Sequence, residues 1–274
     1  MKKLLKNAQE NLRELINKRL VEINATETER LNAERELDII NKHNAAHIFV
    51  FLYGLTKRMK ENDVYFNARG SFYTTFYCSY LLGFLEYNPL DFPLSYAGFY
   101  RAIEKRDLGN KCLSAILDVE TENHAKVIEY LKTQFSEEEL VPDVFMNKDN
   151  ELVSSEHVFN LTTAEFSFKI ELMSSPLEVL DRIKAVEKEN PNIDYANFRL
   201  PEVYEYMQKN ELIPPFFDLK NIALNKPYNI YDLANCQYNV VNVTEYNIGH
   251  HICYAVLYYK LAYIDKNQSK QFEL

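Results

Sequence analysis

The chain has 274 residues, of which 47% are hydrophobic and 26% are charged, a composition typical of a globular protein with a sizeable core. Its formal charge of −9 excludes a protein whose whole surface coats nucleic acid, because such binding needs clustered Lys and Arg, although a local basic groove is still allowed. No stretch approaches 18 uncharged apolar residues, and the start of the chain predicts an amphipathic helix. We therefore expect a cytoplasmic protein without a membrane partner.

The first part of the chain predicts helices and then one short strand. Apolar residues recur at steps of three and four between about residues 4 and 58, and "NATETER" is typical of a helix start. "DVYF" (residues 63–66) predicts a short strand. A very apolar helix is expected over residues 72–85, ended by the prolines of "NPLDFP".

Strands and helices alternate in the rest of the chain. "CLSAILDV" (112–119) and "FSFKIEL" (166–172) predict strands, while residues 122–135 and 175–188 predict helices. "YNIGHHICYAVLYYKLAYIDK" (246–266) predicts a strong final helix. The order indicates an α+β fold with a helical start, a strand–helix–strand core and a helical end.

Cysteines and the histidines His43 and His47 give no firm metal site. The four cysteines are far apart in apolar runs without a C-x-x-C pair, which favours buried free thiols. His43 and His47 are four residues apart on an expected helix, a spacing that could hold a metal. No third ligand is near them in sequence, so a polar helix face is the simpler interpretation.

The segment Arg69-Gly70-Ser71 follows an expected strand and precedes an expected helix. Glycine at such a turn lets the backbone approach a phosphate, and the helix N-terminus adds donors. Arg69 and Ser71 could add a charge and a hydroxyl. The alternative is an ordinary corner between a strand and a helix.

Three acids lie in or beside the expected strands. Asp118 ends one apolar strand, Glu120 follows it, and Glu171 lies within another. An isolated charge there is unfavourable without a partner, and carboxylates of adjacent strands can hold Mg²⁺ against phosphates. Asp118 and Glu171 are the catalytic candidates, and all three acids are the metal-binding candidates. The alternative is that Asp118 caps the next helix and Glu171 faces solvent.

Five stretches in order resemble the polymerase core of the C-family DNA polymerases, represented by the α subunit of bacterial DNA polymerase III. They begin with "LRELINKRL…" and "ARGSFYTTFYCSYLLGFLEYNPL", continue with "AILDVETENHAKVIEYLKTQF" and "FKIELMSSPLEVL…", and end with the final helix. The resemblance implies a nucleotidyltransferase-like palm, a small mixed sheet with helices. It divides the chain into a helical entry to the palm (1–62), a palm-like core with a reduced thumb (63–190) and a shortened fingers-like helical region (191–274).

The resemblance also assigns roles to residues. Gly70 and Ser71 match a Gly-Ser pair that holds the incoming triphosphate, with Arg69 beside it, and His250 matches a histidine of the final helix. The second Gly-Ser pair is replaced by Thr74-Thr75, whose hydroxyls can still donate. Together these six residues are the predicted triphosphate site.

Other positions depart from the family pattern. Asp118 matches the second acid of the catalytic D-x-D, but Ile116 stands at the first. The third acid falls at Ile170, and because a shift of one residue in a strand changes the face, Glu171 is not an automatic substitute. Ile248 replaces a lysine. The fingers are expected to be shortened, and the family's N-terminal, clamp-binding and oligonucleotide-binding regions are expected to be absent.

Three functions follow from this pattern. The first is a degenerate, miniaturised relative of the polymerase core that binds a nucleotide, DNA or a replication protein but lacks normal polymerase activity. The second is an active nucleotidyltransferase with a rebuilt Mg²⁺ site at Asp118, Glu171 and Glu120. The third is a protein of a phage or mobile element that mimics or inhibits a host replicative polymerase, which the acidic balance favours slightly.

Overall fold

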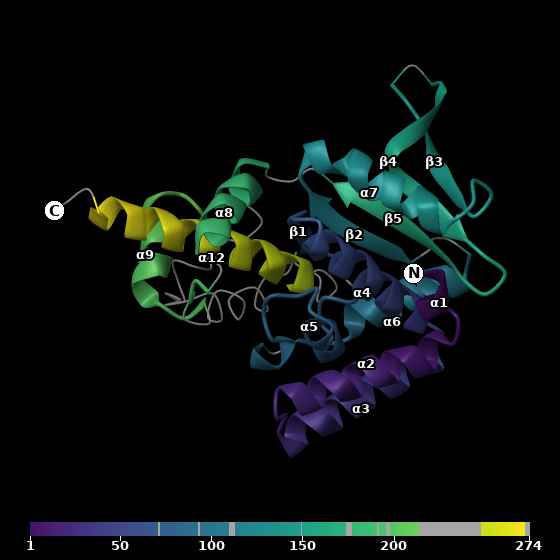
Figure 1. The fold of residues 1–274 in the computed structure, drawn as a ribbon, viewed down its shortest axis with the longest axis horizontal. Coiled ribbons are helices and arrows are strands. Elements are labelled where there is room, and N and C mark those ends of the chain that lie inside the picture. The colour runs from purple at the N-terminus through teal and green to yellow at the C-terminus, as the bar shows by residue number, and fades with distance from the viewer. Residues whose placement is uncertain are drawn as a thin grey trace.

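The computed structural model describes residues 1–70, 72–92, 94–109, 113–148, 150–173, 177–190, 192–195, 198–213 and 248–271. Figure 1 shows the five-stranded sheet with α7 at one end of the molecule and the paired helices α2 and α3 below it. Helices α8, α9 and α12 are grouped at the other end. The observed mixture of helices and one mixed sheet confirms the predicted α+β class with a nucleotidyltransferase-like fold.

The helical start is confirmed. Its helices are α1 (Lys2–Leu5), α2 (Ala8–Glu22), α3 (Glu27–Lys42) and α4 (Ala46–Glu61). The predicted start in "NATETER" is the N-terminus of α3, where Thr26 and Glu29 form a reciprocal capping box. The buried faces of α2, α3 and α4 then supply much of the apolar core below the sheet.

The sheet has the strand order β1-β2-β5-β4-β3. Its strands are β1 (Phe66–Ala68), β2 (Ser114–Val119), β3 (Leu140–Met146), β4 (Leu152–Thr162) and β5 (Ser167–Met173). β2 and β5 are parallel, and the other neighbouring pairs are antiparallel. α7 (Thr121–Gln134) connects β2 to the rest of the sheet, so the predicted strand–helix–strand core is confirmed.

The two faces of the sheet differ in chemistry. Leu117 of β2 and Ile170 of β5 are fully buried on one face, and α4 packs there through Phe51, whose ring lies 4.9 Å from that of Phe168. Residues paired across neighbouring strands share a face, and successive residues alternate between faces. Asp118 therefore lies on the opposite face, on the same side as Ile116.

The predicted helix over residues 72–85 is wrong for most of its length. Only α5 (Tyr77–Leu81) is helical, and residues 72–75 form turns. The reason is a long-range contact, because the Tyr73 hydroxyl donates to the carbonyl of Ile116 on β2 at 2.6 Å. Ser79 then donates through Oγ to the Tyr73 carbonyl at 2.7 Å, which fixes the turn before α5.

Two further differences concern the strands. β1 begins at Phe66, the last residue of the predicted strand, because the Val64 N–H donates to Met59 at 2.9 Å and Asp63 has a φ of 55°. The hairpin of β3 and β4 is absent from the sequence prediction. Its half near the turn carries exposed apolar side chains, namely Val144, Phe145, Met146, Leu152 and Val153, whereas the half near β5 buries Leu140, Phe159 and Leu161.

The remaining helices complete the fold. They are α6 (Ala97–Asp107) and α9 (Pro201–Lys209), which the sequence did not indicate, the short 3₁₀ helix η1 (Pro89–Asp91), and the expected α8 (Leu177–Glu189) and α12 (Ile248–Gln271). α12 contacts both α8 and α9. The division into three regions, with boundaries at 62/63 and 190/191, stays a prediction.

Candidate functional site

Asp118 is the centre of the candidate site. Its side chain is fully buried near the end of β2, beside the edge strand β1. Arg69 approaches from the end of β1, with its Nε 2.8 Å from Asp118 Oδ1. Asn67, paired with Asp118 across the two strands, donates through Nδ2 to Oδ2 at 3.1 Å. Both carboxylate oxygens are thus engaged by protein side chains.

The electrostatics of Asp118 reflect opposing effects. Burial raises the pKa of Asp118 to about 7, because a low-dielectric environment disfavours the charged carboxylate. The positive charge of Arg69 and the hydrogen bond from Asn67 act in the other direction and limit this rise. α12 covers the pair, since the Arg69 guanidinium lies 5.7 Å from the centre of the Tyr254 ring.

The register of β2 and β5 decides which side chains share the face of Asp118. Met173 is paired with Asp118, and Glu171 is paired with Ile116, two residues earlier. Because paired residues share a face, Glu171 lies on the Asp118 face, two residue pairs away along the strands. Ile170, at the matching family position, is fully buried on the opposite face. The face therefore presents Ile116 at the position of the first family acid, and Met173 is the residue opposite Asp118.

Glu120 is held separately from Asp118. It immediately precedes α7 and is 2% exposed. Its Oε1 lies 3.1 Å from Lys184 Nζ of α8, and the amide of Asn123 donates to Oε2. The carboxylate of Glu120 thus joins α7 to α8 rather than turning to Asp118.

The three predicted metal ligands do not come together. Within the described ranges, no group of three or more His, Cys, Asp or Glu side chains is placed to hold a metal ion. Asp118 is bound by Arg69, Glu120 is bound by Lys184, and Glu171 is two residue pairs away from Asp118 along the strands. In this arrangement the donor set does not fit a pair of Mg²⁺ ions.

Gly70 has a packing role in this structure. A Cβ atom added to Gly70 would lie 2.6 Å from Cζ of the Tyr73 ring, too close for any real side chain. Tyr73 is fully buried in this position. The absence of a side chain at Gly70 is therefore explained by the close approach of Tyr73, whatever else the turn binds.

The other predicted triphosphate residues are less accessible or not described. Thr74 is fully buried and Thr75 is 5% exposed, and neither hydroxyl has a hydrogen-bond partner in the described part of the chain. Ser71 and the side chain of His250 lie outside the described residues. The assignment of these residues to a triphosphate stays a prediction.

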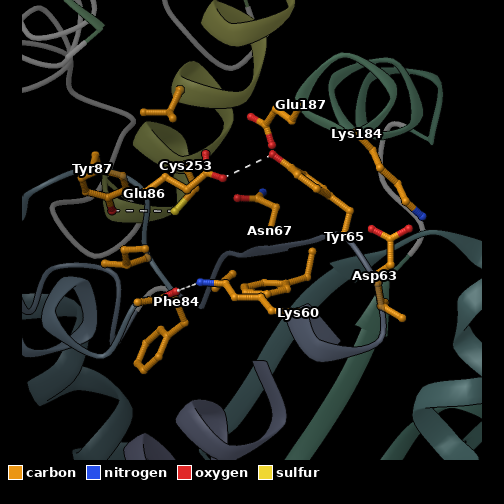
Figure 2. A pocket seen from close by; sticks show the side chains of 16 residues that line it. Lys60, Asp63, Tyr65, Asn67, Phe84, Glu86, Tyr87, Lys184, Glu187 and Cys253 are labelled. Carbon is orange, nitrogen blue, oxygen red and sulfur yellow. Dashed lines mark hydrogen bonds between the residues drawn. The ribbon is translucent and has the colours of Figure 1, made fainter. Parts of the chain in front are cut away.

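A pocket of about 280 Å³ adjoins the candidate site along β1. Figure 2 shows Asn67 near its middle, with Tyr65 and Lys60 on either side. The Nζ of Lys60 donates to the Gly83 carbonyl at 2.6 Å and lies 5.5 Å from the centre of the Phe66 ring. The pocket thus combines aromatic rings, an amide and a cation beside Asp118.

A buried lysine of α12, Lys260, binds three of the residues that line this pocket. Lys260 Nζ lies 2.6 Å from Glu187 Oε1 and 2.7 Å from Glu86 Oε2, and it donates to the Tyr65 hydroxyl at 2.9 Å. Lys260 is 4% exposed. The two carboxylates raise its pKa and together outweigh the burial, so the lysine stays charged and binds α12 to α8 and to the loop before η1.

Sequence reasoning missed several of these partners. The sequence pattern predicts Arg69 at a phosphate and does not predict its ion pair with Asp118, for which the alternation of Asn67 and Arg69 along and just after β1 is the available signal. His43 ends α3 and His47 belongs to α4, so the expectation that they share one helix is wrong. Asn44, with a φ of 51°, makes the turn between them.

The mixed sheet, with helices on one face and a buried acid facing the other, defines a nucleotidyltransferase-like α+β protein. The family described as bacterial DNA polymerase III alpha NTPase domain matches residues 2–212, and this chain belongs to that family. No curated protein matches the chain. Among the described residues, no helix combines the length and the apolarity needed to cross a bilayer.

Proposed function

We propose that this chain is a DNA polymerase III alpha-like domain that binds a nucleotide without carrying out two-metal nucleotidyl transfer. The observation that supports the proposal is the ion pair of Asp118 with Arg69 at 2.8 Å. Two-metal transfer needs carboxylates that are free to hold the ions between the attacking and leaving oxygens. Here a guanidinium takes the place beside the carboxylate that such an ion would need.

The surrounding positions support the same conclusion. Ile116 stands where the family has the first acid, and Met173 is the residue paired with Asp118. Glu120 is bound by Lys184. Assembling a metal site would require the contacts of Asp118 with Arg69 and of Glu120 with Lys184 to break, and each break would take the cation away from a buried carboxylate.

The pocket along β1 is the proposed nucleotide site. Tyr65, Phe66 and Phe84 offer aromatic surface for a base, and Asn67 offers an amide for hydrogen bonds. Lys60 is exposed and, among the residues that the structure describes, forms no ion pair with a carboxylate. Its ammonium is therefore the group best suited to a phosphate.

The first experiment measures single-nucleotide incorporation on a primer–template with Mg²⁺ and then Mn²⁺, with Asp118→Ala beside the wild type. We expect no incorporation by either protein. Incorporation by the wild type that is lost in the variant would overturn the proposal and establish an active site at Asp118.

The second experiment measures the binding of deoxynucleoside triphosphates by calorimetry. We expect Lys60→Ala to weaken binding about tenfold, as loss of a charge-assisted contact would. Lys57→Ala is the matched control, because Lys57 is an exposed lysine one turn earlier on α4 that does not line the pocket. Equal binding of the nucleotide by both variants would exclude this pocket as the nucleotide site. If the chain bound DNA or a replication protein but no nucleotide, the proposed ligand would be wrong.

The active nucleotidyltransferase is the second candidate, and one observation favours it. Glu171 lies on the same face as Asp118, so the strands offer two carboxylates to that side of the sheet. If this candidate is correct, Asp118→Ala and Glu171→Ala should each abolish incorporation, whereas Asp143→Ala on the outer strand β3 should leave it unchanged.

A further inference from the structure

His124 and His157 form a close pair of imidazoles in the sheet region. His124 belongs to α7 and is 3% exposed, whereas His157 belongs to β4 and is exposed. Their Nδ1 atoms are 3.1 Å apart, and the rings meet edge to face with centroids 4.8 Å apart. Two residues 33 positions apart in the chain thus direct the same ring atom at each other.

The second nitrogen of His124 fixes its tautomer. Nε2 lies 3.0 Å from the carbonyl oxygen of Val119, which can only accept a hydrogen bond, so Nε2 carries the proton. Nδ1 of His124 therefore presents a lone pair toward His157. A ring nitrogen bound to a backbone carbonyl, with the other nitrogen left as a ligand, is the arrangement of metal-binding histidines.

The separation of the two nitrogens agrees with binding to one ion. Two nitrogens that each lie about 2.1 Å from a metal are about 3.0 Å apart at a right angle and about 3.4 Å apart at the tetrahedral angle. The observed 3.1 Å lies within this interval. A direct hydrogen bond from Nδ1 of His157 to Nδ1 of His124 gives the same distance. The hydrogen bond and the metal site are distinguished by whether an added metal ion displaces the proton from Nδ1 of His157.

We propose that His124 and His157 form a binding site for a divalent transition metal of the zinc class. Imidazole nitrogen is a ligand preferred by Zn²⁺ and Ni²⁺ over Mg²⁺, so this site is chemically separate from the acids on the other face. The protein supplies two ligands, and water supplies the others through the exposed side of His157. Its affinity is therefore lower than that of a structural site with four protein ligands.

The test is a titration of the full chain with Zn²⁺ against a chromophoric chelator, together with thermal unfolding with and without Zn²⁺. We expect one equivalent bound by the wild type and a higher midpoint of unfolding with the metal, because a ligand that binds only the folded state stabilises it. His157→Ala should weaken this binding about tenfold or more and remove the thermal shift. The His157 side chain is exposed, so this variant should still fold.

Two double variants serve as controls for the other histidines. His43→Ala with His47→Ala, and His250→Ala with His251→Ala, should leave the stoichiometry and the thermal shift unchanged. Absence of zinc binding by the wild type would overturn the proposal. So would binding that persists in His157→Ala or that is lost in either double variant.

Discussion

The helical base and the β1–β2 corner each bury one carboxylate, and they do so in different ways. In the base, Glu36 of α3 accepts hydrogen bonds from the backbone N–H groups of Tyr77 and Cys78 and from the Tyr96 hydroxyl, at 2.7 to 2.9 Å. All three donors are neutral. In the corner, Asp118 is bound by the cation of Arg69 and by Asn67.

The difference teaches what a buried acid signifies in this fold. Burial raises the pKa of both carboxyl groups to about 7. Glu36 serves as a cap that joins α3 to α5 and remains useful when protonated, since its neutral partners do not need its charge. Asp118 is part of an ion pair that depends on the charge. Depth of burial and the direction of the pKa shift are therefore the same for the two acids, and only their partners distinguish them.

The largest expected effect is at the ion pair. Asp118→Ala should lower the free energy of unfolding by about 3 kcal/mol, because it breaks the ion pair with Arg69, whose side chain is only 14% exposed. Denaturant titration measures this loss. The double variant Asp118→Leu with Arg69→Leu should recover most of it.

The control for the ion pair is Asp143→Ala. Asp143 forms a half-exposed pair with Lys169 at 2.7 Å, and loss of such a pair should cost only about 0–1 kcal/mol. A loss at Asp118 no larger than the loss at Asp143 would contradict the role assigned to the corner.

The next effect is the pH dependence caused by Glu36. Its folded-state pKa of about 7 lies above the ordinary value of 4.5, so the folded state holds a proton that the unfolded state releases. The stability contributed by Glu36 is present below pH 4.5 and is lost as the pH rises through 7. The difference in unfolding free energy between the wild type and Glu36→Gln should fall by about 2–3 kcal/mol over this range. A difference independent of pH would contradict this.

A smaller effect is expected at Gly70. Gly70→Ala should destabilise the fold by about 2 kcal/mol, because the added methyl group displaces the Tyr73 ring. Gly54→Ala is the matched control, since a Cβ there meets only side chains at 3.6 Å or more and alanine favours a helix by up to about 1 kcal/mol. If Gly70→Ala were as stable as the wild type, the turn would not be fixed by Tyr73.

The smallest effect is at Asn67. Asn67→Ala should cost about 1 kcal/mol, the usual value of one hydrogen bond, because Arg69 still balances the charge of Asp118. Asn160→Ala, which removes a more exposed hydrogen bond to Asp143, should cost less. A loss at Asn67 comparable to that of Asp118→Ala would mean that the amide, rather than the cation, holds the carboxylate.

The parts of the fold that could be predicted rest on local signals. The capping box at Thr26 and the apolar strands β2 and β5 depend on residues that are neighbours in the sequence. The kind of element and its approximate ends can therefore be predicted from short windows of sequence. The helix predicted over residues 72–85 is wrong because a long-range contact, rather than a local one, decides the structure there. Its apolar residues suit a helix, but the hydrogen bond from Tyr73 to Ile116, 43 residues away, fixes turns instead.

The candidate site was predictable only in part. Asp118 could be predicted as a site residue because it is a charged residue near the end of an apolar strand. Arg69 could be predicted because it precedes Gly70, one of only six glycines in the chain. That these two residues bind each other depends on the pairing of β1 with β2, which no local pattern indicates. The face of Glu171 likewise depends on the register of β5 against β2, and a shift by one residue would reverse it.

The buried Lys260 has a consequence for the order in which the protein assembles. Its partner Tyr65 precedes it by 195 residues, whereas the contacts of the capping box, of Glu36 and of Asp118 all lie before residue 120. On the ribosome, the side-chain contacts of the helical base can therefore form while α12 is still being made, whereas the β1–β2 corner gains its cover only when α12 arrives. Glu86 and Glu187 repel each other until Lys260 arrives between them. Docking of α12 is then a late, long-range event, and we expect it to set the pace of the last step of folding.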